Sequence, residues 1–365
     1  MTRNPPLSRW IFSPLIDALA FTLPAVVALG AVIFQRELGL SEPTPEWLWI
    51  VAVLGVDVAH VWSTAFITYL DRSEIERRPL RYWLVPGLGW VTGVVLYSLG
   101  GPLAFWRTLA YVAVFHFVRQ QAGWMALYRT RAGERGRVGA WVDGAAIYLA
   151  TLYPLAFWHA HLPRRFDWFL PGDFVRGLPE LFVSLLRGAY MLSLLAYLGR
   201  ALYQRARGTP APWGKHALVA TTAATWYAGI VATNGDLAFT LTNVLVHGIP
   251  YAVLVFSYAR HAGASGLAVR IMGGKTLAAA CRFVACLWLL AYGEELLWDR
   301  SLWHERPELF GQSFELPALE ALIVPLLALP QLSHYVLDGL FWRRADNPKL
   351  RQWLSATAPA ANSGL

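Results

Sequence analysis

The chain has 365 residues, of which 56% are hydrophobic and 15% charged, and its mean hydropathy is +0.41. Soluble domains carry about 25% charged residues, so the composition excludes an ordinary soluble protein and indicates an integral membrane protein. The formal net charge of +8 is no sign of nucleic-acid binding, because the basic residues lie in loops between apolar segments, as membrane proteins arrange them.

Ten apolar segments follow one another along the chain, each close to the roughly 20 residues that a helix needs to cross a bilayer. Several contain proline or glycine, which membrane helices tolerate when neighbours satisfy the freed backbone groups. No linker separates domains, so we predict one all-α integral membrane domain over residues 1–365. It is a polytopic transmembrane helix bundle of about ten spans, at 14–35, 47–70, 82–99, 102–128, 139–159, 179–203, 214–232, 237–259, 275–297 and 317–342.

The charges of the loops predict an orientation. Of the 31 Lys and Arg residues, 21 lie at one set of loop ends, 6 lie at the opposite set, and 4 lie inside spans. Cytoplasmic loops are enriched in Lys and Arg. We therefore expect a multi-pass protein of the plasma membrane, the inner membrane of a bacterium, with both termini in the cytoplasm.

Four histidines lie deep inside spans that all run in the same direction. They are about 11 to 15 residues from the outer ends of their spans, which places them roughly 16–22 Å below the outer surface. Ionisable groups at such depth are costly and mark functional sites. We predict that these histidines meet and hold a metal ion; they are His60, His116, His247 and His334.

Each of these histidines has a polar residue three or four positions away, on the same helix face. Metal-bound imidazoles usually donate their second N–H to such a group. The predicted partners are Asp57, Gln120, Asn243 and Asp338, with Arg119 beside them. Each could equally pair with a histidine of another helix, and Arg119 could neutralise Asp57 or Asp338.

Two tyrosines and two glutamates also lie near the predicted site. Tyr251 and Tyr335 are candidates for catalytic or cavity-lining residues, with structural packing as the alternative. Glu294 and Glu295 end a span near the outer face, and we expect them to be solvated at the interface.

The ligand types narrow the choice of metal. Imidazoles with nearby carboxylates suit iron, copper, zinc or nickel. The paired HxxxH and HxxHH boxes of membrane di-iron enzymes are absent, so a single metal is favoured. Non-haem iron with open positions can activate O₂, which suits a lipid-soluble substrate. Zinc would suggest hydrolysis, but no GxSxG or HExxH motif accompanies the histidines.

Four isolated intramembrane histidines on separate helices resemble the Brp/Blh-type bacterial carotene dioxygenases. In that family, four histidines hold one non-haem iron and carotene is cleaved to retinal. The matching elements are Asp57-Val58-Ala59-His60, His116-Phe117-Val118-Arg119-Gln120, His247 and His334. The likeness lies in the kind and layout of these residues, and it implies an iron oxygenase that acts on a carotenoid or another lipid.

Three functions therefore follow from the sequence. The first is a membrane metalloenzyme, a non-haem iron oxygenase with a lipophilic substrate and a possible electron donor as partners. The second is a haem b protein with two histidines as axial ligands, active in electron transfer or isomerisation. The third is a proton- or ion-coupled transporter, although the inverted repeat of many transporters is absent. Copper and zinc remain alternative metals, and the oligomeric state stays open.

Overall fold

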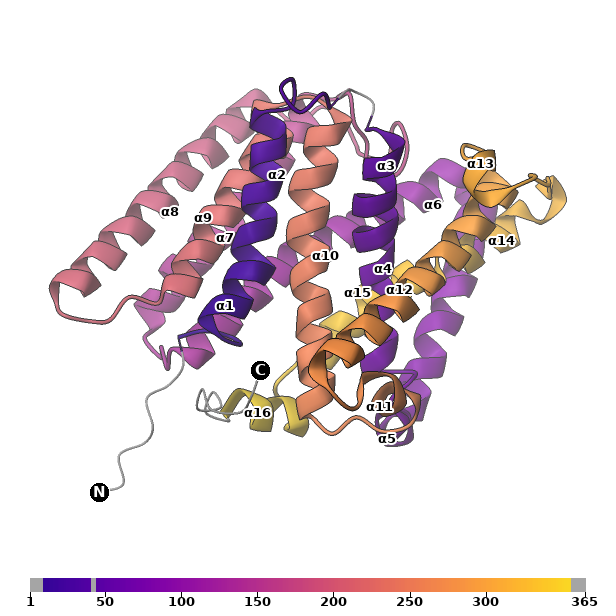
Figure 1. The fold of residues 1–365 in the computed structure, drawn as a ribbon. Coiled ribbons are helices and arrows are strands. Elements are labelled where there is room, and N and C mark those ends of the chain that lie inside the picture. Colours follow the sequence, from indigo (N-terminus) through magenta and orange to yellow (C-terminus); the bar gives the residue numbers. More distant parts are fainter. Residues whose placement is uncertain (1–8, 41–43, 356–365) are drawn as a thin grey trace.

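The computed structural model describes residues 9–40 and 44–355, and all regular elements in these ranges are helices (Figure 1). The predicted all-α class is confirmed for this part of the chain. Within the described ranges, eight helices are long and apolar enough to cross a membrane. They are Pro14–Ile33, Glu46–Ile67, Pro79–Arg131, Arg137–Ala160, Glu180–Ala206, Asp236–His261, Thr276–Trp303 and Pro317–Phe341.

Two differences separate these eight helices from the ten predicted spans. The helix α6 (Pro79–Arg131) covers two of the predicted spans, and it kinks at Gly101, whose φ is 78°. Glycine adopts this left-handed conformation without strain, and the following Pro102 lacks an N–H for the helical ladder. The segment 214–232 is helical as α9 (Trp213–Trp226) and η4 (Tyr227–Ala232), but it is not among the eight. The count of ten stays a prediction.

The helix α10 (Asp236–His261) lies in the middle of the bundle (Figure 1). It packs against α2 (Leu23–Ile33), the π-helical η2 (Trp49–Val58), α4 (Ala59–Ser63) and α9. Its buried face mixes apolar side chains with Thr242, Asn243 and His247. A helix surrounded by other helices can carry such polar groups, because neighbouring helices rather than lipid surround them.

Two further groups of helices flank α10. On one side, α7 (Arg137–Ala160) packs against α8 (Glu180–Ala206) and α9. On the other side, α14 (Glu320–Leu327) and α15 (Leu329–Phe341) pack against α6, and α12 (Thr276–Trp298) packs against α4 and η2. The shorter elements are α1 (Pro14–Asp17), η1 (Ala18–Thr22), α3 (Glu46–Leu48), η3 (Thr64–Ile67), α5 (Arg72–Arg77), α11 (Leu267–Met272), η5 (Asp299–Trp303), α13 (Pro307–Phe310), η6 (Pro317–Leu319) and α16 (Pro348–Ser355).

The first and last described elements lie at the same end of the bundle. In Figure 1, α1 begins near the end that carries α5, α11 and α16, whereas α3 and α13 lie near the opposite end. Arg343 and Arg344 follow α15 at the first of these ends. The arrangement places the arginine-rich loops at one end, while the membrane side that this end faces remains a prediction.

Candidate metal centre

The structure brings the four predicted histidines together from four different helices. His60 comes from α4, His116 from α6, His247 from α10 and His334 from α15, and none is more than 5% exposed. Neighbouring ring centroids lie 4.6 to 5.2 Å apart. The pairs are His60–His247, His247–His116, His116–His334 and His334–His60, so the four rings form a closed cycle of contacts.

Three of these imidazoles have the spacing of a metal site. Ligand nitrogens of His60, His247 and His334 all lie within 4.8 Å of one another. Two metal–nitrogen bonds of about 2.1 Å place their nitrogens at most about 4.2 Å apart, so small side-chain shifts would close this set around an ion. His116 belongs to a second set, with His334 and Asp338. His334 is therefore the residue common to both sets.

The four histidines have several ring nitrogens that make no hydrogen bond to the described residues. Within the described residues, Nε2 of His60, His116 and His334 and both ring nitrogens of His247 are buried without a hydrogen bond. Leaving one buried polar group unsatisfied costs roughly 1–3 kcal/mol. Such a concentration of unpaired ring nitrogens at one point fits a bound cation better than a packing role.

A backbone contact orients His60. Its Nδ1 lies 3.2 Å from the carbonyl oxygen of Val56, one turn earlier. A carbonyl only accepts, so Nδ1 carries the proton and Nε2 keeps a free lone pair. The predicted partner Asp57 lies 3.7 Å from the same nitrogen, beyond hydrogen-bond distance.

A chain of hydroxyl groups orients His334. Its Nδ1 lies 2.7 Å from Oγ1 of Thr64, and that oxygen lies 2.8 Å from the hydroxyl of Tyr251. The Tyr251 hydroxyl in turn donates a short hydrogen bond to the carboxylate of Asp338. When each hydroxyl donates toward Asp338, Nδ1 of His334 donates to Thr64 and its Nε2 is left as a ligand. The predicted pairing of Asp338 with His334 is thus indirect, since their closest atoms are 3.9 Å apart.

Aromatic contacts hold the other two histidines. The ring of His247 stacks on Phe117, with centroids 3.5 Å apart and planes inclined by 7°. His116 lies beside Tyr335, with centroids 5.0 Å apart. These contacts restrict ring rotation without occupying the nitrogens.

Among the described residues, no hydrogen bond joins three of the predicted polar partners to a histidine. Asn243 donates to the carbonyl of Phe239 in its own helix, and its Oδ1 is unpaired. Arg119 bonds to the hydroxyl of Tyr148, and no ion pair in the described part of the chain joins it to Asp57 or Asp338. Both amide atoms of Gln120 lack partners in the described part of the chain.

The expectation for Glu294 is wrong. Its side chain is 5% exposed and accepts a 2.7 Å hydrogen bond from Nε1 of Trp62. The following residue, Glu295, is partly buried. The packing of α12 against α4, the helix that carries Trp62, explains the burial of Glu294.

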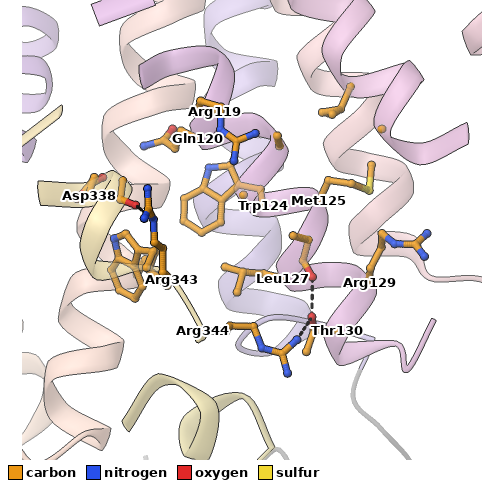
Figure 2. A pocket seen from close by; sticks show the side chains of 18 of the residues that line it. Arg119, Gln120, Trp124, Met125, Leu127, Arg129, Thr130, Asp338, Arg343 and Arg344 are labelled. Atoms are coloured by element: carbon orange, nitrogen blue, oxygen red, sulfur yellow. Dashed lines mark hydrogen bonds between the residues drawn. The ribbon is translucent and has the colours of Figure 1, made fainter. Parts of the chain in front are cut away.

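Two cavities reach the histidines from opposite ends of the bundle. The basic cavity has a volume of 990 Å³ and extends from His116, Tyr251 and Tyr335 to Arg343 and Arg344. Figure 2 shows the two arginines with other residues of the lining. The acidic cavity has a volume of 510 Å³. It is lined by His60, Tyr335 and Asn243, and then by charged side chains that include Asp57, Asp236 and Glu305. Tyr335 lines both cavities, so it lies where they approach each other.

Sequence reasoning missed two residues of the centre. Thr64 bonds His334, and Phe117 stacks on His247. A signal for Thr64 was present, because it follows His60 by four positions and therefore shares its helix face. Phe117 gave no comparable signal, since an aromatic residue beside a histidine is common in apolar helices.

Comparison of the chain with protein-family models, with curated proteins and with solved structures finds no match in any of the three.

Proposed function

We propose that this protein is a membrane metalloenzyme, a non-haem iron oxygenase that acts on a lipophilic substrate. The observation that carries the proposal is the convergence of buried imidazole nitrogens that have no hydrogen-bond partner among the described residues. The resemblance to carotene dioxygenases predicts the same chemistry, with a carotenoid or another lipid as substrate.

We assign three of the four histidines as metal ligands and the fourth to the wall of the basic cavity. His60, His247 and His334 would hold the ion, and His116, which lines the basic cavity, would approach it from the substrate side. Three protein ligands with a remaining position are typical of catalytic rather than structural metal sites. Iron bound in this way supplies the capacity to activate O₂.

The other residues would orient these ligands and exclude water. The hydroxyl chain from Thr64 to Asp338 keeps the proton of His334 on Nδ1. Phe117 fixes the plane of His247. Tyr335 lies between the cavities and is the hydroxyl best placed to meet a substrate beside His116.

A second candidate function has an observation in its favour. Because cavities reach the cluster from both ends, the histidines could relay protons or an ion across the membrane. The acidic side chains of one cavity would then collect cations. This candidate differs from the first in requiring transport without a resident metal.

Metal analysis of the purified protein tests the proposal. We expect about one iron per chain and no Soret band. His60→Ala, His247→Ala and His334→Ala should each lose most of the iron. His261→Ala is the matched control, because His261 is an exposed histidine at the end of the same helix as His247.

Three results would contradict the proposal. Wild-type protein from iron-replete cells without stoichiometric metal would overturn it. A strong Soret band would favour the haem protein. Proton or ion flux in proteoliposomes that survives chelation would favour the transporter.

A further inference from the structure

The basic cavity combines an apolar body with a cationic mouth. Along α6 its lining runs from Phe115 to Thr130, sixteen residues with a helical rise of about 22 Å. Between these limits it is lined mainly by apolar side chains, among them Trp124, Met125 and Leu127 (Figure 2). Its volume of 990 Å³ lies at the upper end of the range for small-molecule sites, about 300–1,000 Å³. The shape suits one long apolar chain.

Two of the arginines that line this cavity, Arg343 and Arg344, have no acidic partner among the described residues, whereas Arg129 pairs with Glu134 and Asp143. Arg344 donates to the hydroxyl of Thr130, and Arg343 donates to the carbonyl of Gly339. Both side chains are exposed and lie just beyond the end of α15. Their remaining N–H donors are available to an anion, and guanidinium groups bind carboxylates and phosphates with paired hydrogen bonds.

The carboxylates of the same cavity are already paired. Glu134 accepts from Lys215 and Arg200, and Asp338 accepts from Tyr251. The mouth formed by Arg343 and Arg344 therefore keeps its positive charge. Deeper in the cavity, the unpaired amide of Gln120 offers a further hydrogen bond one turn from His116.

We propose that the basic cavity binds a single-chain lipid with an anionic head group, a carboxylate or a phosphate, held by Arg343 and Arg344. The apolar chain extends toward His116 and brings a carbon of the chain to the histidine cluster. The role of this lipid as the substrate rests on the proposed function. Its binding in the cavity is independent of the metal site.

Radiolabelled oleate and oleyl alcohol test this proposal in neutral detergent, because they share one chain and differ in the charge of the head group. We expect oleate to bind at least 10-fold more tightly than the alcohol. The double variant Arg343→Gln/Arg344→Gln should weaken oleate binding at least 10-fold and leave the alcohol unchanged. Arg72→Gln/Arg270→Gln is the matched control, because these exposed arginines lie outside the cavity.

A cavity-filling variant separates binding in the cavity from binding to the protein surface. Gly123 lines the cavity, and a Cβ added there would meet no atom within 4 Å. Gly123→Leu should therefore fold and weaken the binding of both ligands. Gly188→Leu, at an equally open glycine of α8, should bind both ligands as the wild type does.

The outcomes divide clearly. Equal affinity for oleate and oleyl alcohol would overturn the proposal. Oleate affinity that is unchanged in both Arg343→Gln/Arg344→Gln and Gly123→Leu would also overturn it. Displacement of oleate by millimolar inorganic phosphate alone would assign the mouth to free phosphate and would also overturn it. If His334→Ala lacks metal but still binds oleate with the expected pattern, the lipid site stands independently. If the wild type binds oleate but holds no metal, only the proposed function fails.

Discussion

At the scale of the residue, the tautomer of the His334 imidazole depends on the hydroxyl of Thr64. Thr64 is the direct contact of His334, and Tyr251 and Asp338 complete the chain behind it. Groups that accept from a metal-bound histidine fix its tautomer and raise its basicity. Thr64 therefore determines which ring nitrogen of His334 carries the proton. With the proton on Nδ1, the lone pair of Nε2 is free to bind a metal.

Replacing Thr64 tests this role. Thr64→Val keeps the shape of the side chain but removes the acceptor for His334. We expect metal affinity to fall by roughly 10- to 100-fold, as measured by competition with a chelator of known affinity. Thr225→Val is the control, because Thr225 is equally buried and bonds only within its own helix. Unchanged affinity in Thr64→Val would show that the hydroxyl chain does not orient the ligand.

At the scale of the element, a buried charge cluster joins α6, α7, α8 and α9. Asp143 is fully buried and accepts from Arg129, from Arg200 at 3.1 Å and from Lys215 at 3.2 Å. Lys215, which is 1% exposed, also donates to Glu134 at 2.6 Å. Removing one member of a buried ion pair is strongly destabilising, because its partner stays buried.

Lys215→Met should lower the free energy of unfolding by about 3 kcal/mol. The two arginines still neutralise part of the negative charge, so the loss falls at the lower end of the range for broken buried pairs. Equilibrium unfolding in mixed micelles measures it. Lys275→Met, at an exposed lysine before α12, is the control and should change stability little.

The pH dependence of the unfolding free energy tests whether the lost ion pairs of Lys215 cause this destabilisation. Burial raises the pKa of Glu134, but the hydrogen bonds and charges of Lys215 and Arg200 outweigh burial and hold it below the usual 4.5. A carboxylate with a depressed pKa contributes stability above its unfolded-state pKa and loses it as the pH falls through the folded-state value. The difference between wild type and Lys215→Met should therefore shrink on acidification below about 4.5. A difference that is independent of pH would show that lost packing, rather than charge, explains the effect.

At the scale of the whole molecule, charge is distributed unevenly between the two ends of the bundle. Arginine-rich loops gather at the end that carries α5, α11 and α16, and the acidic cavity opens toward the other end. The positive-inside rule predicts that the arginine-rich end faces the cytoplasm. The lipid site would then open toward the cytoplasmic leaflet.

Reporter fusions test this orientation. Fluorescent protein fused after residue 365 should fluoresce in the cytoplasm, and alkaline phosphatase fused at the same position should be inactive. Phosphatase inserted in the loop after α7, near Arg164, should be active. The opposite pattern would invert the bundle and move the lipid site to the outer leaflet.

The sequence by itself determined that the protein is helical and that its four deep histidines lie at a common level along their helices. Apolar segments of spanning length predict helices, because a bilayer leaves backbone groups no partner except those within the helix. Helical rise along those segments then placed His60, His116, His247 and His334 at one level, and the structure brings all four together.

Only the tertiary structure decided which groups face one another. Spacing along one helix suggested Asp338 for His334 and Asn243 for His247. The structure instead bonds His334 to Thr64 of another helix segment and stacks His247 on Phe117. Helix rotation and crossing set such contacts, and these depend on the packing of the whole bundle. The same dependence explains the burial of Glu294 and the two cavities, because neither is encoded within a single segment.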